Sequence, residues 1–238
     1  PTSFVFAHNL WYAHDDPGQS PPDLPVAEQG GLVGQDPAFS SGLAIDATSP
    51  AAAAGLDAPE VIAELANTLR ADPWINIPHL ADDNYVEQLA TLMARTVDKE
   101  RVVYVEFSNE VWNDVFGQSR DSRLAGKRLG LSSNDYEAQL RYYSKRSVEV
   151  FKIFERVFGG TSRLVRVMGS QAANPWVSNT VLAHEDAWKQ VAALAIAPYF
   201  GGELGTPESH AATRAMALDD LFAWLRTRSM PMVRDWLR

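Results

Sequence analysis

Two periods of apolar residues alternate along the chain from residue 57 onward, and they predict alternating helices and strands. Short runs rich in β-branched and aromatic residues are typical of strands, whereas apolar positions three and four residues apart indicate one face of a helix. Strands are predicted at 74–77, 102–108, 163–168 and 193–197, with a weaker pattern at 4–6. Helices are predicted at about 57–71, 82–97, 134–158, 174–184 and 211–228. This alternation predicts βαβ units and a parallel sheet.

The first 56 residues lack a regular period. Proline and glycine are dense between residues 15 and 55, which indicates loops. A loop of that length is uncommon inside a compact domain, so we expect a functional insertion or a poorly ordered segment. The polar stretch 114–133, with three glycines, gives no helical pattern either. We therefore divide the chain into an irregular Pro/Gly-rich N-terminal segment, 1–56, and a (β/α) domain, 57–238.

Polar or aromatic residues follow each of the four clear strands. They are His79, Asn109 with Glu110, Gln171 and Tyr199. Because the carboxyl ends of parallel strands meet at one edge of a sheet, we expect these side chains to share that edge, as in α/β barrels. No glycine-rich phosphate loop follows any strand, so a nucleotide-binding fold lacks support. The pattern favours an α/β fold of the (β/α)8 TIM-barrel type, of which only part is recognisable.

Composition removes several classes of function. The 238 residues carry a formal net charge of −9, which disfavours nucleic acid as a partner because phosphate binding requires a basic face. The absence of cysteine excludes disulfides, thiolate catalysis and Cys-ligated zinc. No apolar run reaches membrane-spanning length. The chain begins at Pro1 without a signal-peptide pattern, so we expect a processed product or a piece of a longer protein.

The strand 102–108 ends in a group of residues that suits sugar chemistry. Cleavage of a glycosidic bond needs one carboxylic acid to protonate the leaving oxygen and a second carboxylate across the anomeric carbon. Glu110 is the candidate acid/base, and burial beside Trp112 is expected to raise its pKa toward the useful range. Asn109 is a candidate hydrogen-bond donor to a ring hydroxyl, and Trp112 and Trp176 are candidates to stack on sugar faces.

Four motifs, taken in order, resemble a known family. They are DPWINIPH (72–79), YVEFSNEVWN (104–113), GSQ (169–171) and APYF (197–200). This set resembles the clan A glycoside hydrolases, the cellulase- and mannanase-like retaining (β/α)8 barrels, and a group of bacterial clan A-like proteins of which some are labelled cellulose-binding. The resemblance covers roughly residues 57–238 and implies barrel strands three to six. It implies Glu110 as acid/base, His79 near the subsite floor, and Tyr199 as the aromatic residue that contacts the nucleophile.

The second carboxylate of such a site is not recognisable. In that clan the nucleophile is a glutamate at the end of strand seven, and VRDW (233–236) is not that motif. We therefore expect the nucleophile outside this chain, which by itself should be inactive or nearly so. Glu203 is a poorer candidate because it follows strand 193–197 in a glycine-rich loop. Glu106 shares side-chain parity with Glu110 and is expected to pair with a cation such as Arg166.

The sequence predicts a glycosidase acting on a β-linked polysaccharide, extracellular or in the cell envelope, linked to carbohydrate-binding modules in its full-length parent. No metal or organic cofactor is implied. A non-catalytic carbohydrate-binding or scaffold protein on a degraded barrel is the alternative, and a barrel enzyme of another class, such as a lyase, is a third. Structural roles also stay open, with Glu110 as a helix-start carboxylate and His79 and Tyr199 as packing residues.

Overall fold

The computed structural model describes residues 4–7, 58–196, 198 and 201–236. Its first elements are β1 (Phe4–Ala7), α3 (Ala58–Leu69), β2 (Asp72–Ile77), α4 (Asp83–Thr96), β3 (Val103–Phe107), α5 (Gly117–Arg128), α6 (Asp135–Phe158) and β4 (Leu164–Gly169). They are followed by α7 (Pro175–Ala183), η2 (His184–Gln190), β5 (Ala193–Ala195), η3 (Gly202–Gly205), α8 (His210–Ala215), α9 (Leu218–Trp224), η4 (Leu225–Ser229) and α10 (Met230–Trp236).

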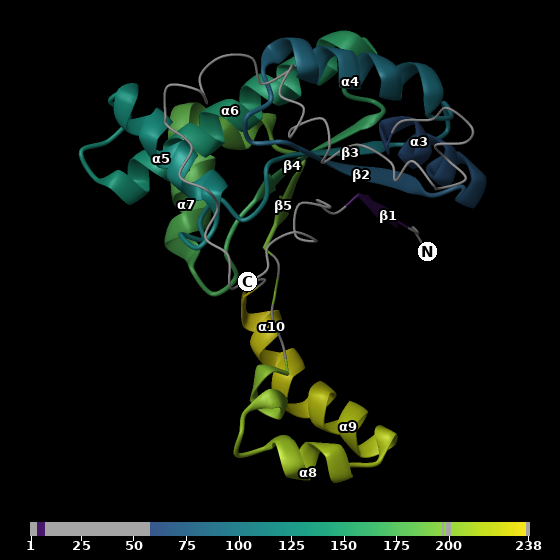
Figure 1. The fold of residues 1–238 in the computed structure, drawn as a ribbon, viewed down its shortest axis with the longest axis vertical. Helices are drawn as coiled ribbons and strands as arrows, with labels where there is room; N and C mark the ends of the chain where they lie inside the picture. Colours follow the sequence, from purple (N-terminus) through teal and green to yellow (C-terminus); the bar gives the residue numbers. More distant parts are fainter. Residues whose placement is uncertain (1–3, 8–57, 197, 199–200, 237–238) are drawn as a thin grey trace, which may run out of the picture.

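The strands lie in the sheet in the same order as in the chain. β2, β3, β4 and β5 form a four-stranded parallel sheet, and β1 pairs in parallel alongside β2 (Figure 1). The register aligns Asn76 with Glu106, and Glu106 with Val167. The predicted alternation of helices and parallel strands is therefore confirmed. The strand predicted at 193–197 is shorter than expected and ends at Ala195.

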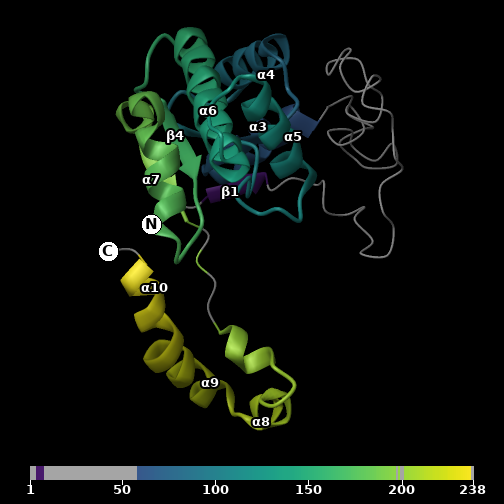
Figure 2. The ribbon, with the colours of Figure 1, turned by 90° about the vertical axis from the view of Figure 1, so that its left-hand side faces the viewer.

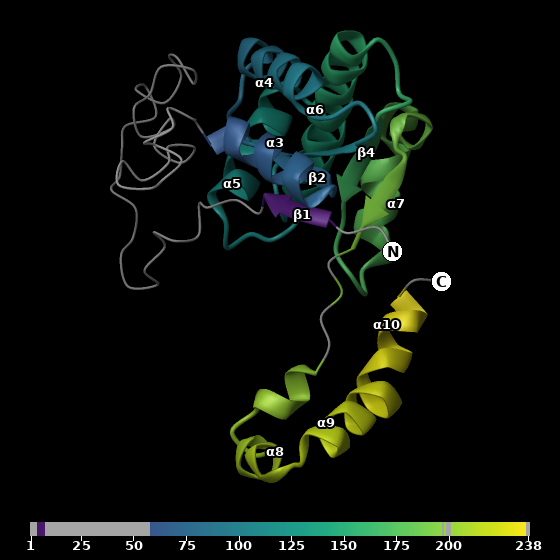
Figure 3. The ribbon, with the colours of Figure 1, turned by 90° about the vertical axis from the view of Figure 1, so that its right-hand side faces the viewer.

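The two faces of the sheet differ in character. One face is mainly apolar, and it packs with residues of α4 and α6 in a single core. Its sheet residues include Ile75, Ile77, Val105, Phe107 and Met168. The helices α3, α4, α6 and α7 contact one another in chain order and form the layer over this face (Figures 1 and 3). The opposite face carries polar and aromatic side chains, including Trp74 stacked on Tyr104 with ring centroids 5.5 Å apart.

The ends of the main helices follow local chemistry. The Asn134 side chain accepts a hydrogen bond from the Glu137 backbone N–H at the start of α6, and Asp82 caps α4 through Tyr85 in the same way. Helix α6 ends at Gly159, whose φ of 73° is the left-handed conformation that glycine adopts at low cost. These predicted starts and stops are confirmed.

Helix α5 occupies the polar stretch for which no helix was predicted. Its buried positions are Ser119, Ser122 and Gly126 rather than large apolar residues, so the sequence shows no apolar period. Gly126 lies against the backbone of Ala138 on α6, and a Cβ atom there would lie 2.6 Å from the Ala138 carbonyl carbon. Small residues thus replace an apolar stripe where the two helices pack closely.

The C-terminal helices differ from the single helix predicted at 211–228. Extended backbone at Met216 and Ala217 separates α8 from α9, and helix then continues through η4 into α10. The wider π turn of η4 precedes Pro231, which lacks an N–H and would crowd the preceding turn of a regular α-helix. These helices extend away from the sheet as an arm (Figure 2). None of the described helices is long and apolar enough to cross a membrane.

Candidate functional site

The polar residues predicted to share one edge follow neighbouring strands of the sheet. His79 follows β2, Asn109 and Glu110 follow β3, and Gln171 follows β4. Since the three strands are parallel neighbours, their carboxyl ends lie along the same edge, with the β3 residues in the middle. Tyr199, predicted to follow the last strand, lies outside the described residues.

The turn after β3 has an unusual backbone. Ser108 and Glu110 have φ values of 60° and 44°, in the left-handed region that residues other than glycine rarely adopt. Side chains from two other elements hold this turn. Asn76 Nδ2 donates to the Ser108 carbonyl at 2.8 Å, and Gln118 Nε2 donates to the Asn109 carbonyl at 2.8 Å. Such a conformation costs on the order of 1 kcal/mol per residue and persists where the surroundings fix it.

Glu110 stands at this turn with part of its surface exposed. Its Oε2 atom accepts a hydrogen bond from Asn113 Nδ2 at 3.3 Å, and its carbonyl accepts from the Asn113 backbone N–H at 2.9 Å. The carboxylate is thus tethered within its own loop while it remains accessible at the sheet edge. Asn109, beside it, is half-buried.

Glu106 is the most buried carboxyl of this region, with 7% of its surface exposed. Its Oε2 atom accepts from Trp74 Nε1 at 3.0 Å. Its Oε1 atom lies against the backbone of Gly169, where an added Cβ would be 2.7 Å away. The Tyr143 hydroxyl accepts from the Gly169 N–H at 2.6 Å and lies beside the same point. Glu106 is therefore enclosed by β2, β4 and α6.

The prediction that Glu106 pairs with Arg166 is wrong, and the register of the sheet explains why. Glu106 aligns with Val167, whereas Arg166 aligns with Val105 and so lies on the opposite face of the sheet. There the Arg166 guanidinium binds Glu155 of α6 at 2.8 Å. Glu106 instead receives its hydrogen bond from an uncharged indole.

Burial raises the pKa of Glu106 to about 7. The hydrogen-bond donors of Trp74 and Asn76 favour the anion and oppose this effect, while the negative charge of Glu110 adds to it. Burial likewise raises the pKa of the Tyr143 hydroxyl, and the charge of Glu106 contributes. A buried carboxyl with a pKa near neutrality therefore lies on β3, the strand that leads into the Asn109–Glu110 turn.

The raised pKa predicts how stability depends on pH. Because the folded protein binds a proton at Glu106 that the unfolded chain has lost, the free energy of unfolding should fall as pH rises from about 4.5 to about 7. The Glu106→Gln variant lacks this pH-dependent contribution to the free energy of unfolding. The stability of the wild type relative to this variant should fall by on the order of 3 kcal/mol from about pH 4 to about pH 8. Urea unfolding across that range measures the difference, and a constant difference would contradict the prediction.

His79 is tied to helix α5. Its Nε2 atom lies 3.1 Å from Asp121 Oδ2. Burial raises the pKa of the Asp121 carboxyl, but the hydrogen bond and charge of His79, together with Arg120, outweigh burial and hold that pKa below its usual value. Sequence reasoning missed Asp121 and Gln118 because both lie on the unpredicted helix α5. That helix supplies partners to the ends of both β2 and β3.

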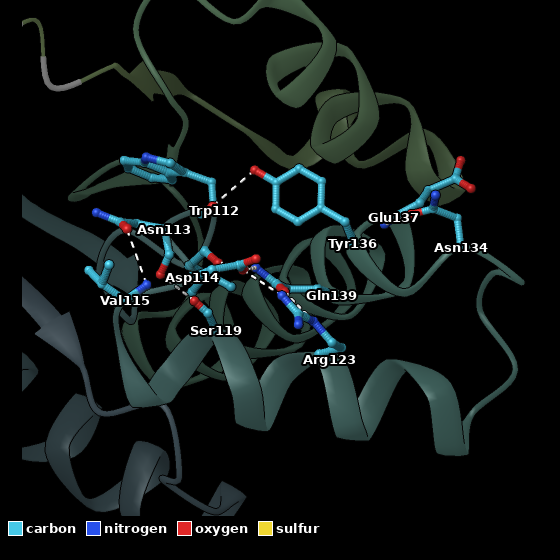
Figure 4. Close-up of polar contacts among 11 residues, drawn as sticks. Trp112, Asn113, Asp114, Val115, Ser119, Arg123, Asn134, Tyr136, Glu137 and Gln139 are labelled. Carbon is cyan, nitrogen blue, oxygen red and sulfur yellow. Dashed lines mark hydrogen bonds and ion pairs between the residues drawn. The ribbon is translucent and has the colours of Figure 1, made fainter. Parts of the chain in front are cut away.

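Of the two tryptophans predicted to stack on sugars, Trp112 is buried and Trp176 is exposed. Trp112 is 8% exposed and belongs to the core, with its carbonyl accepting from the Tyr136 hydroxyl at 2.9 Å (Figure 4). Trp176 is 47% exposed and stacks on Tyr136 with centroids 5.7 Å apart. Trp176 therefore offers more surface to a ligand than Trp112. Gln171 is half-buried, and its Oε1 atom accepts from Asn174 Nδ2 at 3.0 Å.

Within the described part of the chain, no group of three or more His, Asp or Glu side chains is arranged to hold a metal ion. Comparisons with protein-family models, with curated proteins and with solved structures find no match. The chain is an α/β domain with alternating helices and a parallel sheet. These comparisons identify no family for it.

Proposed function

We propose that this chain is part of a retaining glycoside hydrolase that cleaves a β-linked polysaccharide, on a sheet that belongs to a (β/α)8 barrel. The observation that carries the proposal is the turn after β3. Two left-handed residues flank Asn109, and Asn76 and Gln118 fix the turn from both sides. Strained backbone persists only where its surroundings fix it, and such strain clusters at functional sites, including the carboxyl ends of strands.

In the proposed mechanism Glu110 acts twice. It first donates its proton to the glycosidic oxygen, so that the bond to the anomeric carbon breaks with a neutral leaving group. A second carboxylate, proposed to come from outside this sequence, attacks that carbon and forms the glycosyl-enzyme. Glu110, now ionised, then takes a proton from the water that displaces the carboxylate. Asn109 is proposed to bind a sugar hydroxyl, with His79 and Gln171 on the strands to either side.

The alternative is a protein that binds carbohydrate without cleaving it. The observation that favours it is Trp176, whose indole is 47% exposed and held flat against Tyr136. An exposed ring in a fixed orientation suits stacking on a sugar face. This alternative uses the same edge of the sheet and requires no second carboxylate. Either function places the protein with extracellular or envelope polysaccharide.

Incubation of the natural protein that contains this sequence with β-glucans, mannans and xylans tests the proposal. We expect hydrolysis of at least one polysaccharide class, with the first product formed in the β configuration when followed by proton NMR. Binding without hydrolysis in a pull-down on the insoluble polysaccharide would favour the alternative. A first product of inverted configuration would overturn the retaining mechanism.

A further inference from the structure

β5 lies at one end of the sheet, and its side chain on the helical face is partly uncovered. Leu194 aligns with Met168 of β4, whose side chain belongs to the core under the helices. Met168 is fully buried, whereas Leu194 is 37% exposed. Trp188, in η2 just before β5, is 56% exposed. The apolar face of the sheet therefore ends at β5 with apolar surface in contact with water.

The C-terminal arm, from η3 to α10, follows β5 where the alternation of elements predicts the next helix over the sheet. In the described part of the chain, the helices of the arm make their main contacts with one another rather than with the sheet. Leu218 and Phe222, one turn apart on α9, are 65% and 46% exposed. Uncovered apolar side chains are thus present both on β5 and on the arm.

The root of the arm is packed against its own helix. The Gly201 N–H donates to Ser229 Oγ at 3.1 Å, and Ser229 is fully buried. An added Cβ at Gly201 would lie 3.1 Å from the Leu225 side chain, so η4 packs closely on the chain that leaves β5. At the other end of the arm, α9 lies away from the sheet of its own chain (Figures 1 and 3). A second copy of the chain can supply an identical arm.

The charges on the two surfaces are complementary in one orientation. Glu185 and Asp186, both exposed, lie in η2 before the start of β5, where Asp186 also binds Lys189 at 2.7 Å. A helix that covers a parallel sheet runs antiparallel to the strand before it, so its later turns lie beside the start of that strand. In the arm, the turns after α9 carry Arg226 and Arg228, both exposed. An arm laid on β5 in this orientation places two cations beside two anions.

We propose that β5 and η2 bind the C-terminal arm of a second copy of this chain, and that two copies exchange their arms. Leu218 and Phe222 of one copy cover Leu194 of the other, and η4 of the arm lies beside η2. Asp219 and Asp220, at the start of α9, then lie toward the other end of β5, away from the acidic residues of η2. Since each copy has one arm and one receiving surface, the exchange closes as a dimer with two-fold symmetry. This contact is independent of the proposed activity.

Engineered cysteines show which arm covers β5, since this sequence has none of its own. Gln190→Cys, in η2, and Thr227→Cys, in η4, leave the proposed apolar and charged contacts intact. Both are made in the natural protein that contains this sequence and are joined by a short bis-maleimide, and mass spectrometry identifies the linked peptides. We expect a link between copies when the two single variants are mixed.

The control is Gln190→Cys mixed with Leu129→Cys, an exposed position at the end of α5, which should give a much lower yield of linked peptides. A link formed only within one copy of the double variant would mean that the arm covers its own β5, and would overturn the inference. A yield no higher than that of the control would overturn it as well.

Charge reversal separates an exchange of arms from any other association of two copies. One variant carries Arg226→Glu and Arg228→Glu, and the other carries Glu185→Arg and Asp186→Arg. Each variant alone places like charges in the contact, so it should dimerise about tenfold more weakly than the wild type. A mixture of the two variants restores opposite charges in both contacts and should dimerise again.

Sedimentation velocity measures the dimer in each sample, and circular dichroism checks that each variant is folded. A dimer that appears in the mixture but not in the separate variants would support the exchange, because arms that cover their own β5 cannot rescue each other. A wild type that stays monomeric at every concentration, or a dimer that neither reversal weakens, would overturn the inference.

Discussion

Glu110→Gln is expected to lower kcat/KM of the natural protein on a polysaccharide about 100- to 10,000-fold, because glutamine cannot supply the proton that the leaving oxygen needs. The amide oxygen of glutamine can still accept from Asn113 Nδ2, so the turn after β3 should persist and the melting temperature should change little. An aryl glycoside with an acidic phenol as leaving group needs less protonation. Its bond cleavage should therefore be affected much less than that of the polysaccharide.

Glu203→Gln is the matched control for that experiment. Glu203 lies exposed in η3, within a glycine-rich segment, and is the other carboxylate weighed for the site. We expect its replacement to leave hydrolysis within about twofold of the wild type, the variation usual for a surface change. Equal polysaccharide turnover by Glu110→Gln and the wild type would remove Glu110 from the mechanism. A loss confined to Glu203→Gln would move the assignment to that residue.

Gly126→Ala should destabilise the domain by on the order of 3 kcal/mol or more, at the upper end of the cost of overpacking. The added methyl group would meet the backbone carbonyl of Ala138, which cannot turn aside as a side chain can. Helix α5 would have to move away from α6. Since α5 carries Gln118 and Asp121, the partners of Asn109 and His79 would move with it. Urea unfolding measures the loss, and the NMR signals of the turn after β3 should shift as well.

Gly117→Ala provides the comparison within the same helix. Apart from the flanking residues and the backbone of its own helix, nothing described lies within 4 Å of the position that its Cβ would occupy. Alanine also has a higher helix propensity than glycine, so we expect a change between zero and a gain of about 1 kcal/mol. The same substitution nine positions apart should thus have opposite signs. If Gly126→Ala were as stable as Gly117→Ala, the close packing of α5 on α6 would be refuted.

The sequence predicts elements well where one residue pattern determines them. The run rich in Val, Tyr and Phe at 103–107 forms β3, and Asn134 and Gly159 mark the start and end of α6, because each of these signals acts on its own stretch of backbone. Helix α5 was not predicted because its buried positions are small residues that match the surface of α6. Its fit depends on the partner helix, which no local pattern describes.

The candidate site likewise has some features that a local sequence pattern predicts and others that depend on neighbouring elements. That His79, Glu110 and Gln171 follow neighbouring strands could be predicted, since parallel strands share an edge. The environment of Glu106 could not, because the residue opposite it depends on the register between strands, and a shift by one residue would have brought Arg166 to its face. The left-handed backbone at Ser108 was equally unpredictable, because neither glycine nor a turn motif marks it.

The order of the strands in the sheet has a consequence for synthesis of the protein. From β2 onward each strand pairs with the strand that was translated before it, so a growing chain can add each new strand to a sheet already formed. The turn bearing Asn109 and Glu110 depends on Asn76 and Gln118, both of which are translated before α6 is complete. Both backbone partners of this turn are therefore translated well before β5 and the C-terminal arm.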